Sequence, residues 1–249
     1  MNLRYISVLE GDGAYQMAVD EAIMHSVSKG KGENTFRLYR FKPSCISIGY
    51  FQSADQEVDL GRCREHGIEC VRRITGGGAV FHDYMGEITY SIVLKEENFR
   101  YGVEESYEKI CSCLVKALEY FGLKGRFSPI NDVLAEGKKI SGSAQTRKKG
   151  VILQHGTFMY ATDLAVLFSV LKISNEKIRD KMLENAEQRV ITLKKALNRK
   201  ASEKEVIKAL EAGFASQFDL EKGVINEYEK TLLPELQKKY ASEEWLFRR

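Results

Sequence analysis

Residues 72–83 read Arg72-Arg73-Ile74-Thr75-Gly76-Gly77-Gly78-Ala79-Val80-Phe81-His82-Asp83. Three consecutive glycines are unfavourable in conformational entropy unless the backbone must pass close to another group. The successive N–H groups of such a turn can form an anion-binding concavity, and arginines before it can neutralise a phosphate or a carboxylate. A flexible turn with solvated arginines is the plainer interpretation, and this stretch alone favours it. It is neither a Walker loop nor a Rossmann fingerprint, because neither glycine spacing is present in it.

The segments around this turn alternate between strand and helix patterns. Strands are predicted over residues 35–40, 45–49, 68–73, 87–94, 131–135, 139–145 and 151–160, and helices over 14–28, 57–66 and 103–121. The last three strands follow one another too closely for helical crossovers, so that part of the sheet should be antiparallel. After residue 163 the pattern is helical. We therefore expect an α+β fold, with a mixed, largely antiparallel sheet covered by helices.

Composition bounds the class of protein. The 249 residues are 43% apolar and 10% aromatic, which is ordinary for a globular protein with a core. The formal net charge of +3 gives no argument for a nucleic-acid partner. Five cysteines, an odd number without a small disulfide scaffold, indicate a reducing compartment. No segment has the apolar length of a membrane span or a signal peptide, so we expect a cytoplasmic protein with no membrane partner.

Two further segments carry chemistry. In residues 131–145, Asn131-Asp132-Val133 precedes a run that contains Lys139 among glycines and serines. A lysine on such a strand can reach across an open cleft toward a phosphate or carboxylate, and Asp132 could hold a magnesium ion or orient an amine. A surface hairpin with solvated lysines is an equally strong interpretation. In Gln154-His155-Gly156-Thr157, His155 taken alone is more readily a hydrogen-bonded core histidine.

Together these segments closely resemble the lipoate–protein ligase family, part of the wider group of biotin/lipoate ligases and octanoyltransferases. The resemblance covers about residues 1–195, including Asp20-Glu21 and residues 189–193. It implies the fold shared with biotin ligases and class II synthetase domains. It also implies that ATP and magnesium convert lipoate to lipoyl-AMP, and that a lysine then takes the acyl group. That lysine would belong to a lipoyl domain of a 2-oxoacid dehydrogenase E2 subunit or to the glycine-cleavage H protein.

The resemblance also assigns roles to residues. Lys139 matches the family's essential lysine and would stabilise charge on the carboxylate and α-phosphate oxygens. Arg73 would contact the acyl carboxylate or phosphate, and Asp132 would lie near the phosphates or a magnesium ion. The remaining residues expected to bind substrate or adenylate are Thr75, Gly76, Gly77, Gly78, His82, Ala144, His155 and Gly156. Lipoate or octanoate would be the acyl substrate, with no tightly bound cofactor.

The resemblance predicts a catalytic domain over residues 1–195 and a helical extension over 196–249 that packs on it. Many relatives carry a further small C-terminal domain, and we expect this chain to be too short for one. In this it resembles the bipartite ligases, so a separate small partner subunit is expected to assist adenylation.

The main rival is an octanoyltransferase, which moves an acyl group from acyl carrier protein through a cysteine thioester. Residues 145–156 resemble that class. However, those enzymes need a cysteine just before the Asn-Asp segment or well after His-Gly-Thr, and none occurs over 124–132 or after Cys113. The triple glycine also fits the ligases better, so the sequence favours a ligase. The Gly-Arg-Gly-Arg segment typical of biotin ligases is absent from this sequence, which argues against a biotin ligase. The intact Lys139 argues against a non-catalytic sensor.

Overall fold

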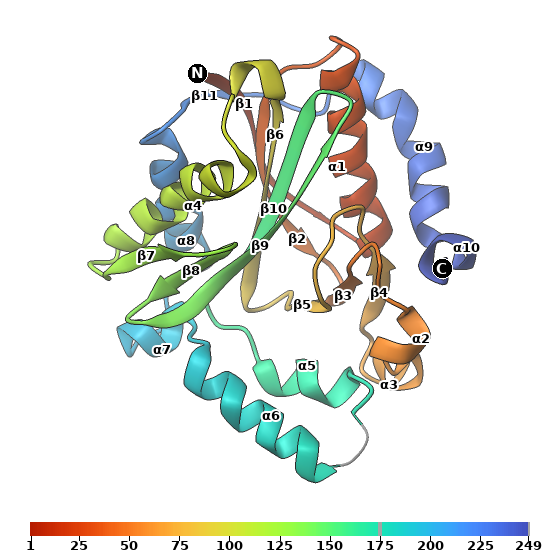
Figure 1. The fold of residues 1–249 in the computed structure, drawn as a ribbon, viewed down its shortest axis with the longest axis vertical. Coiled ribbons are helices and arrows are strands. Elements are labelled where there is room, and N and C mark those ends of the chain that lie inside the picture. The colour runs from red at the N-terminus through yellow and green to blue at the C-terminus, as the bar shows by residue number, and fades with distance from the viewer. Residues whose placement is uncertain (174–175, 249) are drawn as a thin grey trace.

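The computed structural model describes residues 1–173 and 176–248, and Figure 1 shows its two sheets and their helical layers. The large sheet has the order β11-β1-β2-β6-β10-β9-β8-β7, and the small one the order β4-β3-β5. The strands are β1 Asn2–Gly11, β2 Thr35–Phe41, β3 Cys45–Ile48, β4 Glu69–Arg72, β5 Val80–His82, β6 Glu87–Lys95, β7 Gly125–Ser128, β8 Asp132–Ala135, β9 Lys138–Lys148, β10 Val151–Met159 and β11 Asp219–Lys222. The helices are α1 Gly13–Ser28, α2 Ala54–Glu57, α3 Leu60–Glu65, the 3₁₀ turn η1 Glu96–Asn98, α4 Val103–Glu119, α5 Leu164–Val170, α6 Glu176–Arg189, α7 Leu193–Leu197, α8 Glu203–Ala215, α9 Glu227–Ala241 and α10 Glu243–Leu246.

The pairing of the strands confirms the predicted mixed, largely antiparallel sheet. From β2 through β6, β10, β9 and β8 to β7, every neighbouring pair is antiparallel. The two parallel pairs of the large sheet both involve β1, which pairs with β2 and with β11. The strands from β7 to β10 are joined by short connections, which cannot hold the crossovers that parallel strands require. The parallel pairs, in contrast, are joined through α1 or bring together the two ends of the chain.

Helices cover both faces of the large sheet, as predicted. α1 packs with α9 on one face, and α4 packs with α8 on the other (Figure 1). Asp12 is the N-cap residue of α1, and its carboxylate accepts a hydrogen bond from the N–H of Tyr15 at 2.7 Å. On α4, Ile110, Leu114 and Leu118 recur every four residues and are fully buried. Within the described part of the chain, no helix is long and apolar enough to cross a membrane.

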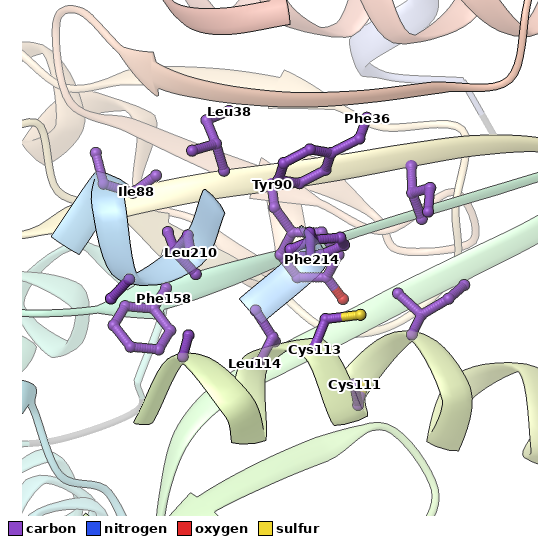
Figure 2. Packing of buried hydrophobic residues seen from close by; sticks show 14 of the residues in the cluster. Phe36, Leu38, Ile88, Tyr90, Cys111, Cys113, Leu114, Phe158, Leu210 and Phe214 are labelled. Atoms are coloured by element: carbon purple, nitrogen blue, oxygen red, sulfur yellow. The ribbon is translucent and has the colours of Figure 1, made fainter. Parts of the chain in front are cut away.

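The larger core cluster lies between the sheet and the α4–α8 layer (Figure 2). Phe36 of β2 stacks on Phe214 of α8 with ring centroids 3.9 Å apart, and Tyr90 of β6 lies against the same ring. Cys111 and Cys113 of α4 are part of this cluster and are fully buried. Stacked aromatic rings and small thiols thus fix the distance between β2, α4 and α8.

Four strands have no counterpart among the predicted segments, namely β1, β5, β7 and β11, and β5 is only three residues long. β1 and β7 lack the regular alternation that identifies a strand. β11 reads Asp-Leu-Glu-Lys and is largely exposed, so its local sequence has no strand signal. It becomes a strand because it pairs with residues 2–5 at the other end of the chain. The segment predicted as a helical extension therefore contributes a strand to the main sheet, while the domain boundary near residue 195 stays a prediction.

Replacing Phe214 by Ala should lower the free energy of unfolding by about 3–5 kcal/mol, because the change leaves a cavity beside Phe36 and Tyr90. Chemical denaturation measures the change. Phe51, which is 88% exposed, provides the matched control, and Phe51→Ala should shift stability by no more than about 0.5 kcal/mol. Equal, small losses in both variants would contradict the packing described here.

Candidate active site

A cavity of about 510 Å³ lies where the two sheets and helices α5 and α6 meet. It is lined by nine of the eleven residues that the sequence nominates, namely Arg73, Gly76, Gly77, Gly78, His82, Lys139, Ala144, His155 and Gly156. These residues come from β5, β9, β10 and the loop of residues 73–79 between β4 and β5, which we call the glycine loop; the four segments are separate in sequence. Thr75 and Asp132 do not line the cavity, but each contacts a residue that does.

The glycine loop is held by the buried side chain of Arg73. Its Nη2 donates to the carbonyl oxygens of Gly76 and Gly78, both at 2.8 Å, and its Nη1 donates to the carbonyl of Ser47 at 2.7 Å. No described residue accepts a hydrogen bond from the N–H of Gly76, Gly77 or Gly78. The loop is no simple hairpin, since β4 and β5 each pair with β3 and not with each other. Its carbonyls are therefore bound by the protein, and its N–H groups remain for a ligand.

The charge of Arg73 has no counterion of its own. Burial lowers the pKa of its guanidinium to about 10, and the group remains protonated at neutral pH. No carboxylate of the described chain pairs with it, and its five hydrogen bonds all go to neutral oxygens. Because every side of the guanidinium is engaged by the protein, direct contact with a substrate carboxylate, as the resemblance implied, has little room. The cation instead supplies positive potential to the cavity wall. Arg72 is directed elsewhere, and binds backbone carbonyls of residues 49–52 and of the C-terminal segment.

A buried chain of hydrogen bonds runs from Arg73 to helix α1. Arg73 Nε donates to Thr75 Oγ1 at 3.1 Å, and Thr75 Oγ1 lies 2.7 Å from His155 Nε2. His155 Nδ1 lies 3.0 Å from Asp20 Oδ2, and Asp20 also pairs with Arg37. Because the Asp20 carboxylate can only accept, the neutral imidazole carries its proton on Nδ1, and its Nε2 accepts from the Thr75 hydroxyl. In the sequence, Asp20 was noted only as part of the Asp20-Glu21 pair. In the structure it orients the glycine loop through His155 and Thr75.

The ionisation of this chain follows from its surroundings. Burial acts to raise the pKa of Asp20, but the Arg37 cation and the His155 contact outweigh it and bring the pKa to about 2. Burial lowers the pKa of the His155 imidazole, although the Asp20 carboxylate acts in the opposite direction. His155 is therefore neutral at pH 7, as the hydrogen-bond directions require.

Lys139 and Asp132 form an ion pair at the partly exposed end of the cavity. Lys139 Nζ lies 2.7 Å from Asp132 Oδ1, and the two side chains are 38% and 29% exposed. A Cβ added to Gly142 would lie 2.8 Å from Lys139 Nζ, so this glycine makes space for the lysine. The backbone carbonyl of Lys139 accepts from the N–H of Ile191 at 2.8 Å, which places the matching segment 189–193 beside the site.

Gly156 on β10 and Ala144 on β9 also line the cavity. A Cβ at Gly156 would lie within 2.9 Å of Ser143 Oγ, the Gly142 carbonyl oxygen and the Tyr90 ring, so only glycine fits there. Ala144 pairs with His155 across β9 and β10. The glycine at position 156 thus lets β10 lie close to Ser143 and to the backbone of Gly142 on β9.

His82 lies on β5 with both ring nitrogens engaged. Nε2 is 2.8 Å from Ser47 Oγ, and Nδ1 is 3.0 Å from Glu87 Oε2. Arg73 Nη1 donates to the same Ser47 oxygen at 3.1 Å, so Ser47 links Arg73 to His82. Ser47 and Glu87 were not nominated from the sequence, because a serine on a short strand and an acidic residue at the start of another carry no local signal.

An apolar slot, which sequence reasoning could not name, makes up much of the cavity. Its side chains include Met17, Tyr39, Phe81, Tyr107, Met159, Leu164, Leu167, Phe168 and Val190. They come from seven parts of the chain, so no single motif contains them. The one available signal was the apolar helix α5, which contributes three of them.

The described residues contain no group of three or more His, Cys, Asp or Glu arranged to hold a metal ion. Asp132, the carboxylate nominated for magnesium, already has its charge paired with Lys139.

The comparisons with known proteins agree with this geometry. Residues 12–215 match the family model described as the lipoyl protein ligase A/B catalytic domain. The chain belongs to this family. It is 36% identical to the octanoyltransferase LipM of Brevibacillus brevis, with 99% of each chain covered, and 36% identical to that of Clostridioides difficile, with 94% of each covered.

Solved structures show the same fold over the whole chain. One is described as a bi-partite lipoate protein ligase and its E2 lipoyl domain from Thermoplasma acidophilum, with a TM-score of 0.89, 34% identity and coverage of 100% of this chain and 99% of that one. Another is lipoate-protein ligase A bound with ATP, with a TM-score of 0.84, 31% identity and 99% coverage of both chains. The predicted family and fold are thereby confirmed.

The expected ligase activity is wrong. The curated relatives that match over almost the whole chain are octanoyltransferases, the activity that the sequence analysis ranked second. They give no support for ATP. A ligase was ranked above an octanoyltransferase because the expected cysteine is missing and because Gly78 adds a third glycine to the turn. Neither feature outweighs similarity along the full chain.

His155→Gln tests the buried hydrogen-bond chain, because an amide can donate to Asp20 and accept from Thr75 without titrating. The folded-state pKa of His155 is below its unfolded value of about 6.5. Below that pH the unfolded chain takes up a proton that folded His155 does not, so wild-type stability should fall as the pH drops from 7.5 toward 5. The variant should lose part of this decline in urea denaturation. An identical decline in both proteins would mean that His155 titrates normally.

Proposed function

We propose that this chain transfers an octanoyl group from the thioester of an acyl carrier protein to a lysine of an acceptor protein. The acceptors with the required chemistry are the lipoyl domains of 2-oxoacid dehydrogenase E2 subunits and the glycine-cleavage H protein. The proposal rests on one observation above others: an apolar slot leads to a free loop of backbone N–H groups and to Lys139. The similarity to octanoyltransferases over 99% of the chain supports the same donor and acyl group.

Each part of the cavity has a role in such a transfer. The slot would bury the octanoyl tail, which stabilises binding in proportion to the apolar area removed from water. The thioester carbonyl would lie beside the N–H groups of Gly76, Gly77 and Gly78. When an amine attacks this carbonyl, the oxygen becomes negatively charged, and preorganised N–H donors and a nearby ammonium stabilise it. Lys139 supplies that ammonium, and Asp132 holds it in place.

The direct test is intact-mass analysis of a lipoyl domain incubated with the chain and octanoyl carrier protein. One added octanoyl group, formed without ATP, is the expected result. A parallel reaction contains free octanoate or lipoate with ATP and magnesium instead of the carrier. Modification in that reaction alone would overturn the proposal. The small partner subunit was expected because it would assist adenylation. Octanoyl transfer from a thioester includes no adenylation, so it should proceed without that subunit.

Lys139→Ala should lower kcat/KM for octanoyl transfer by about a hundredfold or more, because one preorganised charge at the developing oxyanion is lost. The neighbouring Lys138 provides a matched control, since its Nζ reaches only the backbone carbonyl of Glu187 at 3.4 Å, away from the cavity. Lys138→Ala should retain most activity. Equal losses in the two variants would remove Lys139 from its assigned role.

Gly142→Ala offers an independent probe of the same lysine. The atoms nearest to the added methyl group would be the flexible end of Lys139 at 2.8 Å and the Asp132 carboxylate at 3.5 Å, so the fold should tolerate it. Activity should fall because the ammonium is displaced. A variant with wild-type thermal stability and wild-type kcat would show that the lysine's position is not critical.

A further inference from the structure

The C-terminal segment, residues 242–248, lies beside the proposed site without lining it. It contains α10, follows α9 directly and packs against β4 (Figure 1). Among the described residues, none beyond Val190 lines the cavity, and no residue of α10 is fully buried. Its backbone carbonyls and its one tryptophan nevertheless make an extensive set of contacts next to the glycine loop, and these contacts indicate a role for the segment.

Arg72 joins this segment to the turn formed by residues 49–52. Its buried guanidinium donates to the carbonyl oxygens of Trp245 at 3.0 Å, Leu246 at 2.6 Å and Arg248 at 3.1 Å. Nη1 of the same group donates to the carbonyls of residues 49, 50 and 52, at 3.2, 2.8 and 2.6 Å. In return, the indole Nε1 of Trp245 donates to the Arg72 carbonyl at 2.9 Å. One planar guanidinium, with five donors in a fixed arrangement, thus holds the two segments together.

The same turn touches the glycine loop. The N–H of Tyr50 donates to the Thr75 carbonyl at 2.8 Å. A Cβ added to Gly49 would lie 1.9 Å from the Gly77 carbonyl oxygen, so the two backbones are in direct contact and only glycine fits. Within the described chain, the turn forms hydrogen bonds to other segments only with Thr75 and with Arg72. Arg72 therefore sets the position of the turn, and the turn adjoins the loop whose N–H groups remain for a ligand.

Side chains of the segment hold the turn as well. The rings of Trp245 and Tyr50 meet edge to face with centroids 6.0 Å apart, and the Arg248 guanidinium lies 4.2 Å from the Tyr50 centroid and 4.8 Å from that of Trp245. Lys239 Nζ lies 4.1 Å from the centroid of the Trp245 ring and 2.6 Å from Glu21 Oε2. Glu21 belongs to α1. The segment is therefore anchored to the same helix that orients the glycine loop through the buried hydrogen-bond chain.

We infer that residues 242–248 act as a clamp on the glycine loop, with Arg72 and Trp245 as positioning residues; the consequence for octanoyl transfer rests on the proposed function. Preorganised N–H donors stabilise a developing oxyanion only while they are aimed at it. The clamp acts through the turn at residues 49–52 and touches no substrate. Its release should therefore weaken the stabilisation of the oxyanion and leave the apolar slot intact, since Arg72, the turn and the clamp contribute no side chain to the cavity.

Trp245→Ala tests the clamp by its effect on the reaction. It should lower kcat for octanoyl transfer by about tenfold and change the dissociation constant for octanoate by less than about threefold, after correction for the folded fraction. Phe247→Ala is the matched control, because Phe247 lies in the same segment but faces a separate cleft between β4 and the C-terminal helices; it should retain kcat within about twofold. A chain ending at Ser242 should reproduce the Trp245→Ala pattern. Wild-type kcat in either clamp variant, or a loss of octanoate binding that matches the loss of kcat, would overturn the inference.

Fluorescence of the wild-type protein gives a second test that needs no variant. Trp245 is the only tryptophan of the chain, so its emission reports on the clamp. Octanoate would fill the slot with its tail and present a carboxylate to the loop N–H groups, whereas 1-octanol has the same tail without the charge. Because coupling is reciprocal, octanoate should change the Trp245 emission saturably, at the concentrations at which calorimetry detects its binding, and 1-octanol should not. Bound octanoate with unchanged emission would overturn the inference. No binding of octanoate, or no octanoyl transfer by the wild type, would instead overturn the proposed function.

Discussion

The buried guanidinium of Arg73 joins the parts of this molecule that must come together for a site to exist. It binds the carbonyls of two loop glycines, the backbone of β3 through Ser47, and the Thr75 hydroxyl that leads to His155 and α1. An arginine can do this because its planar group has five donors in a fixed arrangement. Removing it would leave at least four oxygen atoms without a donor and release the loop.

Burying this cation without a carboxylate partner is unfavourable, and the cost is reduced because neutral oxygens surround it. The uncompensated charge has a use in the cavity, where an oxygen that gains negative charge would be stabilised. Asp20, in contrast, has its charge shared between Arg37 and His155, so little of its negative potential opposes the developing charge. The two ends of one hydrogen-bond chain thus differ in sign and in degree of neutralisation.

Relatives named octanoyltransferases and structures named lipoate ligases share one fold with this chain, so the fold does not select the donor. In an acyl-adenylate and in a thioester alike, the carbonyl carbon carries a good leaving group. In the second half of either reaction a lysine amine attacks that carbon. A slot, an N–H loop and one lysine serve that step in either chemistry.

The sequence by itself determined the local elements and the identity of the polar site residues. The triple glycine, Lys139, and the pair His155-Gly156 are unusual enough locally to be recognised, and nine of eleven nominated residues line one cavity. Helices α1 and α4 and the antiparallel strands β8–β10 follow from apolar periodicity and short connections. A charge pattern or glycine run is a local property, so a single chain suffices to reveal it.

Only the tertiary structure decided what these residues touch. The acyl slot is assembled from side chains of seven separated segments, and β11 is a strand only because β1 lies beside it. The sequence could not tell that Arg73 binds the glycine loop while Arg72 binds the C-terminal segment. Each of these depends on which face of an element meets a partner far along the chain, and packing of the whole core sets that choice.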